Sequence, residues 1–390
     1  MNNAYEYIVL GCGGLGSAAL YWLARVAGEE VLGIEQFAHG HHNGGSQDHS
    51  RIIRLSYHTS DYIRLAPHAY KAWAEVEAES GVQLVLKTGG LDLGPEEGDG
   101  HVWLERYAAT MDDADVAYER LSAEQAMARF PQFRLPATVQ ALYQAEGGLV
   151  DPRKANATHA ILARAHGAAL LENTQVQHIR PVADGVELET SAGRLTCRRL
   201  VVTAGSWAAR VLRDVGLELP ITVTQEQVTY YQTPNLRAFA PDRFPIWMWL
   251  GPGGFYGFPV YGEIAIKIAE EYCRSEVTPE TRSFEPSPAA EGRVRQFLAK
   301  YIPDALGPVL YSKTCLYDMP PDRNFILDCV PGHPQIIMAN GAAHSFKFAS
   351  LIGRITSQLA VDGHSEYPIA PFGLDRPALT DPSYPREFQI

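Results

Sequence analysis

Residues 6–28 read EYIVLGCGGLGSAALYWLARVAG, and residues 29–37 continue as EEVLGIEQF. The first five residues form a short apolar run typical of a buried strand, and the segment after the glycines has apolar residues at helical spacing. The last segment returns to a strand pattern. Strand, helix and strand within about 35 residues predict a βαβ unit, with a glycine-rich turn between its first strand and its helix.

The glycines of this turn have the spacing G-x-G-x-x-G at Gly11, Gly13 and Gly16, and Glu35 ends the next strand 19 residues beyond Gly16. This context is typical of dinucleotide binding. Gly11 permits a tight turn, and Gly13 lets the backbone approach a pyrophosphate at the helix N-terminus. Gly16 allows close packing of the helix, and Glu35 can accept hydrogen bonds from the adenosine ribose. The pattern does not distinguish NAD from FAD.

Two further strand-then-helix patterns lie far along the chain, RRLVVTAGSWAARVL at 198–212 and QIIMANGAAHSFKFASLIGRITSQLA at 335–360. Three such units at wide spacing indicate one discontinuous, Rossmann-like nucleotide domain of the glutathione-reductase type. We assign residues 1–85, 150–219 and 315–390 to this domain.

The segments between these units have a different pattern. PITVTQEQVTYYQTP at 220–234 and the aromatic-rich stretch at 247–272 alternate apolar and polar residues between Gly-Pro turns. Such alternation predicts an antiparallel sheet. We therefore expect an α/β protein whose second, substrate-binding domain spans 86–149 and 220–314 and is interwoven with the first.

Composition narrows the function classes. Lys and Arg are outnumbered 33 to 45 by Asp and Glu, which gives a formal net charge of -12 and argues against a nucleic-acid partner. No apolar run reaches the ~20 residues that span a bilayer, and the first residues carry no basic targeting pattern, so we expect a cytoplasmic protein. The five cysteines, Cys12, Cys197, Cys273, Cys315 and Cys329, include no C-x-x-C pair, which argues against a disulfide framework and a zinc site.

The loop HHNGGSQDHSRIIRLSY at 41–57 carries Arg51 and Arg54, three residues apart. Taken alone, such arginines are surface cations. The loop, however, resembles the second phosphate-proximal loop of the monomeric sarcosine oxidase and N-methyltryptophan oxidase family of FAD-dependent amine oxidases. The resemblance implies that Arg51 lies against the flavin ring and that Arg54 makes a bidentate pair with the substrate carboxylate.

The segments KTCLYDMPPDRNFILD at 313–328 and MANGAAHSFKFASLIGRITSQLA at 338–360 resemble the same family almost position for position. The resemblance implies a covalent bond from Cys315 to the flavin, although a free cysteine is by itself more typical of a core. Backbone N–H groups at Gly341, Ala342 and Ala343 are expected to face the flavin. Lys347, isolated in the apolar context FKFAS, is expected to join Arg54 at the substrate carboxylate, its alternative being a helix-surface lysine.

Lys267 alternates with isoleucines in EIAIKIA, which places it on the opposite strand face from Ile264, Ile266 and Ile268. In the resembled family the lysine at this place activates oxygen, and Tyr256 in FYGFP matches a tyrosine of the substrate cavity. We expect Trp247 to line the same pocket. Glu271 stands where the sarcosine oxidase pattern has a histidine, and a carboxylate there bears on which amine is bound. Gln47 replaces a second histidine of the pattern.

The expected function is an FAD-dependent oxidase of a secondary amino acid, N-methyl or cyclic, with a carboxylate-bearing amine substrate, O2 as acceptor and hydrogen peroxide as product. The catalytic residues are then Lys267, Arg51 and Tyr256, and a monomer is expected without metal. The alternatives are a flavin dehydrogenase with a non-oxygen acceptor, an NAD-dependent dehydrogenase, and a non-catalytic or RNA-modifying flavoprotein. The residues expected at the cofactor are Gly11, Gly13, Gly14, Leu15, Gly16, Glu35, Gln36, Ser46, Ser50, Arg51, Val176, Ala204, Gly205, Trp207, Cys315, Met319, Gly341, Ala342, Ser345, Phe346 and Lys347.

Overall fold

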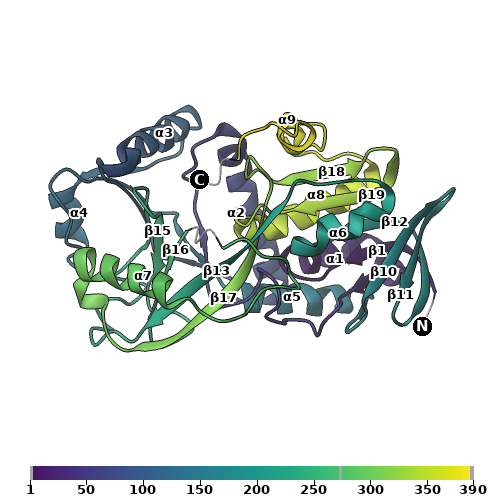
Figure 1. Ribbon diagram of the computed structural model, residues 1–390, viewed down its shortest axis with the longest axis horizontal. Helices are drawn as coiled ribbons and strands as arrows, with labels where there is room; N and C mark the ends of the chain where they lie inside the picture. Colours follow the sequence, from purple (N-terminus) through teal and green to yellow (C-terminus); the bar gives the residue numbers. More distant parts are fainter. Residues whose placement is uncertain (1–2, 272–274, 387–390) are drawn as a thin grey trace.

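The N-terminal strand β1 (Ala4–Leu10) lies inside a largely parallel sheet of the computed structural model, which describes residues 3–271 and 275–386 (Figure 1). It pairs in parallel with β2 (Val31–Ile34) on one side and β12 (Gly193–Val202) on the other. β2 pairs with β9 (Ala169–Leu171), and β12 pairs with β19 (His333–Asn340), which also pairs with β18 (Ile326–Val330). Three distant parts of the chain therefore build one sheet, as expected.

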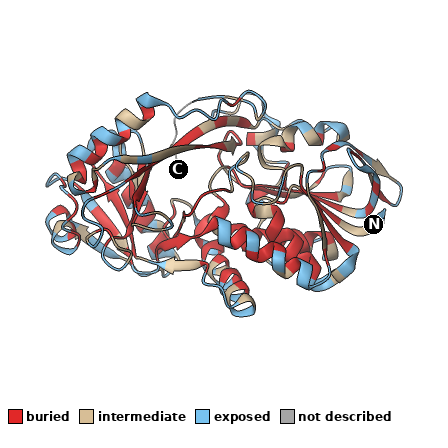
Figure 2. Ribbon diagram, turned by 90° about the horizontal axis from the view of Figure 1, so that it is seen from below, coloured by how far each residue is buried: buried red, intermediate tan, exposed pale blue. Residues whose placement is uncertain are grey.

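Alternate residues of these strands are buried on opposite faces of the sheet, because successive side chains of a strand point to opposite sides. Val9 and Val201 pack with α1 (Gly14–Ala27), α2 (Ser60–Ser80), α5 (Pro152–Ala165) and α8 (Ala349–Asp362). Ile8 and Leu200 pack on the other face with α6 (Ala208–Leu212) and the hairpin of β10 (Val176–Val182) and β11 (Gly185–Thr190). Figure 2 shows the buried residues concentrated in the strands and on the inner faces of these helices.

The second lobe contains a sheet that is antiparallel except where β14 meets β5. Its strands, in spatial order, are β17 (Val309–Met319), β13 (Thr222–Tyr231), β16 (Ile266–Glu270), β15 (Phe255–Phe258), β14 (Ile246–Trp249), β5 (Gly90–Gly94), β7 (Gln140–Gln144) and β6 (Glu119–Ser122). The helices α3 (Gly100–Asp113), α4 (Ala123–Arg129) and α7 (Pro288–Tyr301) lie in the same lobe (Figure 1).

A small antiparallel sheet carries the expected cofactor loop. It consists of β3 (Arg51–Ile53), β8 (Gly148–Val150) and β4 (Val85–Lys87). The last helix is α9 (Pro377–Thr380), and the 3-10 helices are η1 (Gly28–Glu30), η2 (Glu97–Asp99), η3 (Gly205–Trp207), η4 (Arg213–Val215), η5 (Pro303–Ala305), η6 (Phe346–Phe348) and η7 (Ala370–Phe372).

The predicted fold class is confirmed: a discontinuous Rossmann-like sheet accompanies a second lobe built on an antiparallel sheet. The exact domain boundaries stay a prediction, and β17 runs across the one predicted at residue 315. No helix of the described residues is both long and apolar enough to cross a bilayer. Cys12, Cys197, Cys315 and Cys329 are free thiols, while Cys273 lies outside the described residues.

The close approach of α1 to the β1 turn generates a stability prediction. A Cβ at Gly16 would lie 1.7 Å from the carbonyl oxygen of Gly11, which is backbone and cannot rotate away. Gly16→Ala should therefore lower the free energy of unfolding by about 3 kcal/mol, the upper part of the usual range for overpacking, and weaken cofactor retention. Thermal and urea denaturation with and without added FAD measure both effects.

Gly292→Ala is the matched control. Gly292 lies in α7, where an added Cβ meets nothing within 4 Å, so alanine should be neutral or stabilise by roughly 0.5–1 kcal/mol. Equal stability of the two variants would contradict the packing role assigned to Gly16.

Candidate active site and cofactor cavity

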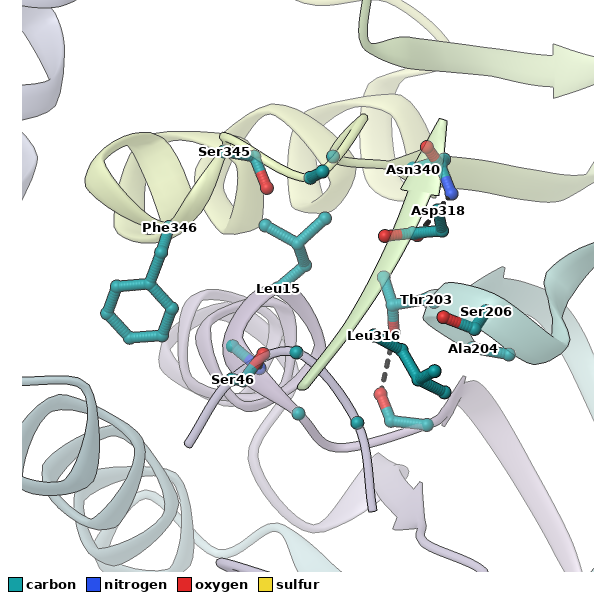
Figure 3. A pocket seen from close by; sticks show the side chains of 18 of the residues that line it. Leu15, Ser46, Thr203, Ala204, Ser206, Leu316, Asp318, Asn340, Ser345 and Phe346 are labelled. Atoms are coloured by element: carbon teal, nitrogen blue, oxygen red, sulfur yellow. Dashed lines mark hydrogen bonds between the residues drawn. The ribbon is translucent and has the colours of Figure 1, made fainter. Parts of the chain in front are cut away.

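One large cavity extends from the glycine turn before α1 to strands β14 and β15 of the second sheet and has a volume of about 1820 Å³ with its mouth included. Most residues expected at the cofactor line it: Gly11, Gly13, Gly14, Leu15, Glu35, Gln36, Ser46, Arg51, Val176, Ala204, Gly205, Trp207, Gly341, Ser345, Phe346 and Lys347. Five others lie behind its walls: Gly16, Ser50, Cys315, Met319 and Ala342. Figure 3 shows residues from several of these segments converging on the cavity.

The glycine turn leaves the N-terminus of α1 open toward the cavity. Gly11 has a φ of +88°, which favours glycine, and the Gly14 N–H donates to Ser46 Oγ at 2.9 Å. The helix begins at Gly14 without an acidic residue in its first turn, so its positive end is available to an anionic group. This geometry suits a pyrophosphate.

Glu35 is held at the end of β2 by backbone contacts. Its Oε2 accepts a hydrogen bond from the Cys12 N–H at 2.9 Å and its Oε1 from the Phe37 N–H at 3.1 Å. The side chain is buried and lines the cavity. Oε1 also lies 3.3 Å from His41 Nε2, whereas Oε2 keeps a further lone pair, which fits the expected contact with ribose hydroxyls.

The turn between β19 and η6 is backbone-strained. Ala342 and Ala343 have φ values of +46° and +70°, a left-handed region in which non-glycine residues are uncommon. The Ala342 N–H donates to Asn340 Oδ1 at 2.9 Å, and Asn340 Nδ2 donates to Asp318 Oδ2 at 2.6 Å (Figure 3). Burial raises the pKa of Asp318 to about 7, so part of this carboxyl is protonated at neutral pH. The sequence analysis missed Asp318, whose isolation in the apolar run CLYDM was the available signal.

Arg51 brings a positive charge to the cavity wall. Its guanidinium donates to the carbonyl oxygens of Ser50 at 2.9 Å and Gly45 at 2.8 Å, which fixes its position, and its Nη1 lies 4.0 Å from Asp48 Oδ2. Cys315 is buried nearby on β17, and burial raises the pKa of its thiol to about 11, against the opposing charge of Arg51. The thiol is therefore protonated at neutral pH in this structure.

Lys267 lies on the opposite face of β16 from Ile266 and Ile268, as the alternation predicts. Its ammonium is buried 2.7 Å from Asp48 Oδ2 and donates to the Ser50 carbonyl at 2.8 Å. Burial, opposed by the Asp48 charge, lowers the pKa of Lys267 to about 8. Ile264 precedes the strand and is exposed.

Asp48 is a second residue that the sequence analysis missed. Its φ of +89° is strained for a non-glycine residue, and its Oδ1 accepts a hydrogen bond from the Tyr230 hydroxyl at 2.6 Å. Electrostatic attraction from Lys267 and Arg51 outweighs burial and lowers the pKa of Asp48. No local signal marks this residue, because Lys267 is more than 200 positions away in the chain.

Two expected substrate residues lie elsewhere. Trp247 was expected in the pocket, but its ring stacks on Phe297 of α7 at 5.5 Å between centroids and lies in the apolar core. Side chains alternate along β14, so it is Met248 that lines the cavity. Arg54 was expected to clamp a carboxylate, but it is buried outside the cavity wall and paired with Asp92 at 2.9 Å. Its carboxylate partner belongs to the protein.

Tyr256, Glu271 and Lys347 do line the cavity, at its second-sheet end. The Tyr256 hydroxyl lies 3.3 Å from that of Tyr317. Burial, together with the positive charges of Arg54 and Arg323, lowers the pKa of Lys347 to about 7. Arg323 lines the same end and was not singled out from the sequence, although it stands within the family-like segment 313–328.

The family described as FAD dependent oxidoreductase matches residues 6–359 of this chain. The chain belongs to that family. Monomeric sarcosine oxidase of Arthrobacter sp. (strain TE1826) is 31% identical over 380 residues, which cover 96% of this chain and 97% of the relative. N-methyl-L-tryptophan oxidase of Escherichia coli (strain K12 / DH10B) is 30% identical over 379 residues, 95% of this chain and 99% of the relative. The resemblance stated from the sequence is thereby confirmed.

Two solved structures have the same fold as this chain. NikD, described as an unusual amino acid oxidase essential for nikkomycin biosynthesis, superposes in its open form with a TM-score of 0.85 at 26% identity, over 95% of this chain and 98% of NikD. L-proline dehydrogenase from P. horikoshii also gives a TM-score of 0.85, at 21% identity over 96% and 97% of the two chains, which shows the shared fold.

FAD fits the residues of the cavity. The open positive end of α1 and the fixed Glu35 carboxylate suit the adenosine diphosphate half, and the cavity continues past Arg51 and the strained turn at Ala342 toward the second sheet. The enzyme is an FAD-dependent oxidoreductase, and the glycine turn, Glu35 and Arg51 would hold its cofactor.

The buried pair of Asp48 and Lys267 generates a pH-dependent prediction. The pKa of Lys267 is about 8 in the folded protein and about 10.4 when unfolded, so the unfolded chain binds more protons between these values and stability rises with pH there. Asp48→Asn leaves the ammonium without its partner, which lowers the lysine pKa further. We expect a loss of about 3–5 kcal/mol in unfolding free energy at about pH 6.5 and a clearly smaller loss at about pH 9.5, measured by urea unfolding.

Asp322→Asn is the control, because Asp322 forms a partly buried ion pair with Arg376 at 2.7 Å. Arginine does not titrate in this pH range, so the loss of unfolding free energy in Asp322→Asn should be the same at both pH values. A pH-independent loss for Asp48→Asn as well would contradict the coupling to Lys267.

Proposed function

We propose that this enzyme oxidises the C–N bond of a small secondary amino acid, N-methyl or cyclic, with O2 as the acceptor. When bound, FAD would supply the two-electron acceptor for this oxidation, with O2 as the final acceptor and hydrogen peroxide as the product. Two relatives that align with nearly the whole chain are named as oxidases of sarcosine and N-methyl-L-tryptophan, which supports this proposal. The single observation that carries it is the Lys347 ammonium on the wall of the cofactor cavity, where it has no carboxylate within ion-pair distance among the described residues.

This end of the cavity suits an amino acid. Lys347 supplies a cation for the carboxylate, and Met248, Tyr256 and Phe258 provide an apolar wall for the substrate carbon atoms. Among the described residues no carboxylate lies within ion-pair distance of Lys347. Holding both ends of a small substrate fixes its reacting C–H bond, and orientation of this kind provides a large part of catalysis. The imine that forms is then hydrolysed by water.

Protonation of two groups sets the pH range of the proposed reaction. The pKa of Lys347 is about 7, and the group binds a carboxylate only while it is protonated, so substrate affinity should fall as pH rises through that value. Hydride transfer needs a neutral substrate amine, which becomes more abundant as pH rises. The two requirements oppose each other and predict a bell-shaped dependence.

We further propose that Cys315 holds the flavin through a thioether. The residues that follow it on β17, Leu316 to Asp318, line the cavity, and the Arg51 charge favours its thiolate. A monomeric state and a cytoplasmic location stay predictions, and metal ligands are not gathered by the described residues, which contain no group of three candidate side chains.

A flavin dehydrogenase with a non-oxygen acceptor is the second candidate. The observation in its favour is the Asp48 carboxylate beside Lys267, since a neutralised ammonium attracts developing superoxide charge less strongly than a free one. An NAD-dependent dehydrogenase is a more distant third reading, because the family that matches this chain uses FAD.

The first prediction from this function concerns the cofactor bond. Purified protein should be yellow, and its colour should stay with the pellet on acid precipitation, because a thioether survives denaturation. In Cys315→Ala the colour should move to the supernatant. Cys197→Ala, a buried cysteine away from the cavity, should behave as the parent. Colour in the supernatant of the parent itself would remove the covalent role from Cys315, and a colourless protein would contradict the proposed function.

The second prediction concerns the acceptor. Lys267→Met should lower kcat/KM for O2 by about 100-fold, the usual effect of removing one preorganised charge, and leave turnover with an artificial electron acceptor within about threefold. Lys300→Met, on the surface, is the control. Peroxide production against N-methyl and cyclic amino acids gives the measurement. Unchanged oxygen reactivity in Lys267→Met would favour the dehydrogenase.

A further inference from the structure

Three cationic side chains lie near the second-sheet end of the cavity, but only two face it. Arg323 and Lys347 line the wall, whereas Arg54 does not. The three interact electrostatically, since the charges of Arg54 and Arg323 both lower the pKa of Lys347. Which of them binds the substrate carboxylate therefore depends on which is already engaged by the protein.

Arg54 is engaged through both of its terminal nitrogens, while its Nε is buried without a hydrogen-bond partner. Its Nη1 donates to Asp92 Oδ1 at 2.9 Å and its Nη2 to the Tyr107 hydroxyl at 3.1 Å, and its guanidinium lies over the rings of Tyr57 and Tyr107 at 5.3 and 5.0 Å. Asp92 is itself fixed by the Ser56 hydroxyl at 2.6 Å. Turning Arg54 toward a substrate would leave a buried carboxylate unpaired, at a cost of about 3–5 kcal/mol.

Arg323 differs from Arg54 because it lines the cavity and its backbone is fixed by contacts on both sides. Its φ of +50° is strained for a non-glycine residue, and strain of this kind is retained where surrounding contacts impose it. Asp322 accepts from Arg376 at 2.7 Å, and the Arg323 carbonyl lies 2.9 Å from His344 Nε2. The turn is thus fastened on both sides of the arginine.

The side chain of Arg323 is only 2% exposed and pairs with Glu271 Oε1 at 3.2 Å. Glu271 follows β16 directly, where its N–H donates to the Gly254 carbonyl, and its own side chain is 20% exposed at the cavity wall. The carboxylate also attracts the Lys347 ammonium, whose pKa it raises. One anion and two cations therefore share this end of the cavity.

We infer that Arg323 and Lys347 bind the substrate carboxylate, and that Glu271 exchanges Arg323 for the ammonium group of the substrate. The inference rests on the proposed function and specifies how its substrate is held: as a zwitterion whose amine and carboxylate are attached to the same carbon. Charge is conserved in the exchange, because the substrate carboxylate replaces Glu271 at Arg323 and the substrate ammonium replaces Arg323 at Glu271. Arg54 remains with Asp92 throughout.

A zwitterion then forms ion pairs with Arg323, Lys347 and Glu271 in place of the one pair that it breaks, whereas a simple carboxylate leaves Glu271 without a cation. This difference can be measured with two ligands of nearly equal shape. Glycine betaine carries a quaternary ammonium and a carboxylate, and 3,3-dimethylbutanoate has carbon in place of the nitrogen. Neither has an oxidisable N–H amine, so binding to the holoenzyme can be followed by isothermal titration calorimetry without turnover.

In Glu271→Gln we expect the affinity for 3,3-dimethylbutanoate to stay equal or improve. The Kd of glycine betaine should rise, and its fold-change should exceed that of 3,3-dimethylbutanoate at least tenfold. Glu270→Gln is the neighbouring control, because Glu270 pairs with Arg293 outside the cavity and should change neither Kd. The same change for both ligands in Glu271→Gln would overturn the assignment of the ammonium to Glu271.

Arg323→Lys and Arg54→Lys form the matched pair for the carboxylate, since each keeps the charge and loses the planar fork. Arg323→Lys should raise the Kd of both ligands at least tenfold, and Arg54→Lys by less than threefold. The reverse order would overturn the assignment in favour of Arg54. Peroxide production by the parent is scored separately, so that ligand binding without any oxidase activity would refute the proposed function and leave this inference standing.

Discussion

The contact between Gly16 and the carbonyl of Gly11 is the constraint on which the arrangement of this protein depends. A Cβ at position 16 would lie 1.7 Å from that oxygen, so α1 approaches β1 more closely than any other residue would allow. The Thr203 hydroxyl donates to the same carbonyl at 2.7 Å, which joins β12 to the turn. Because α1 is fixed in this way, its N-terminus, the Glu35 carboxylate and the Ala342 turn surround one cavity although they lie far apart in the chain.

Buried charged residues shape the end of the cavity at the second sheet. Some of its cations have a carboxylate partner close by and others do not. Lys267 and Arg54 are neutralised by Asp48 and Asp92 and support the wall from behind. Arg51 lines the cavity and lies farther from the same Asp48 carboxylate, at 4.0 Å, and Lys347 has no carboxylate partner among the described residues. A buried cation without an anion is costly, so a ligand that brings an anion recovers part of that cost.

The sequence predicts the fold and the nucleotide end of the site well, because these depend on local patterns. The glycine spacing, the strand runs and Glu35 specify geometry within about 35 residues of each other. The substrate end depends on side chains brought together from distant segments. No sequence pattern around Arg54 predicts its contact with Asp92, and none around Lys267 predicts its contact with Asp48. Trp247 shows a further limit. The period-2 pattern of IWMW predicts that alternate residues lie on opposite faces of the strand, but it does not predict which face meets the cavity. In the structure Met248 lines the cavity and Trp247 lies in the apolar core.

The charge balance of the whole chain separates attraction at a distance from recognition in the cavity. A formal net charge of -12 repels a carboxylate-bearing ligand outside the protein, but salt screens this field within about 8 Å at physiological ionic strength. A zwitterion has no net charge and is hardly affected by it, whereas a simple anion is opposed. The cations inside the cavity act over a few ångströms in a poorly solvated environment, where the same charges interact far more strongly. An acidic exterior and a cationic cavity therefore favour the same ligands, namely amino acids that carry both charges.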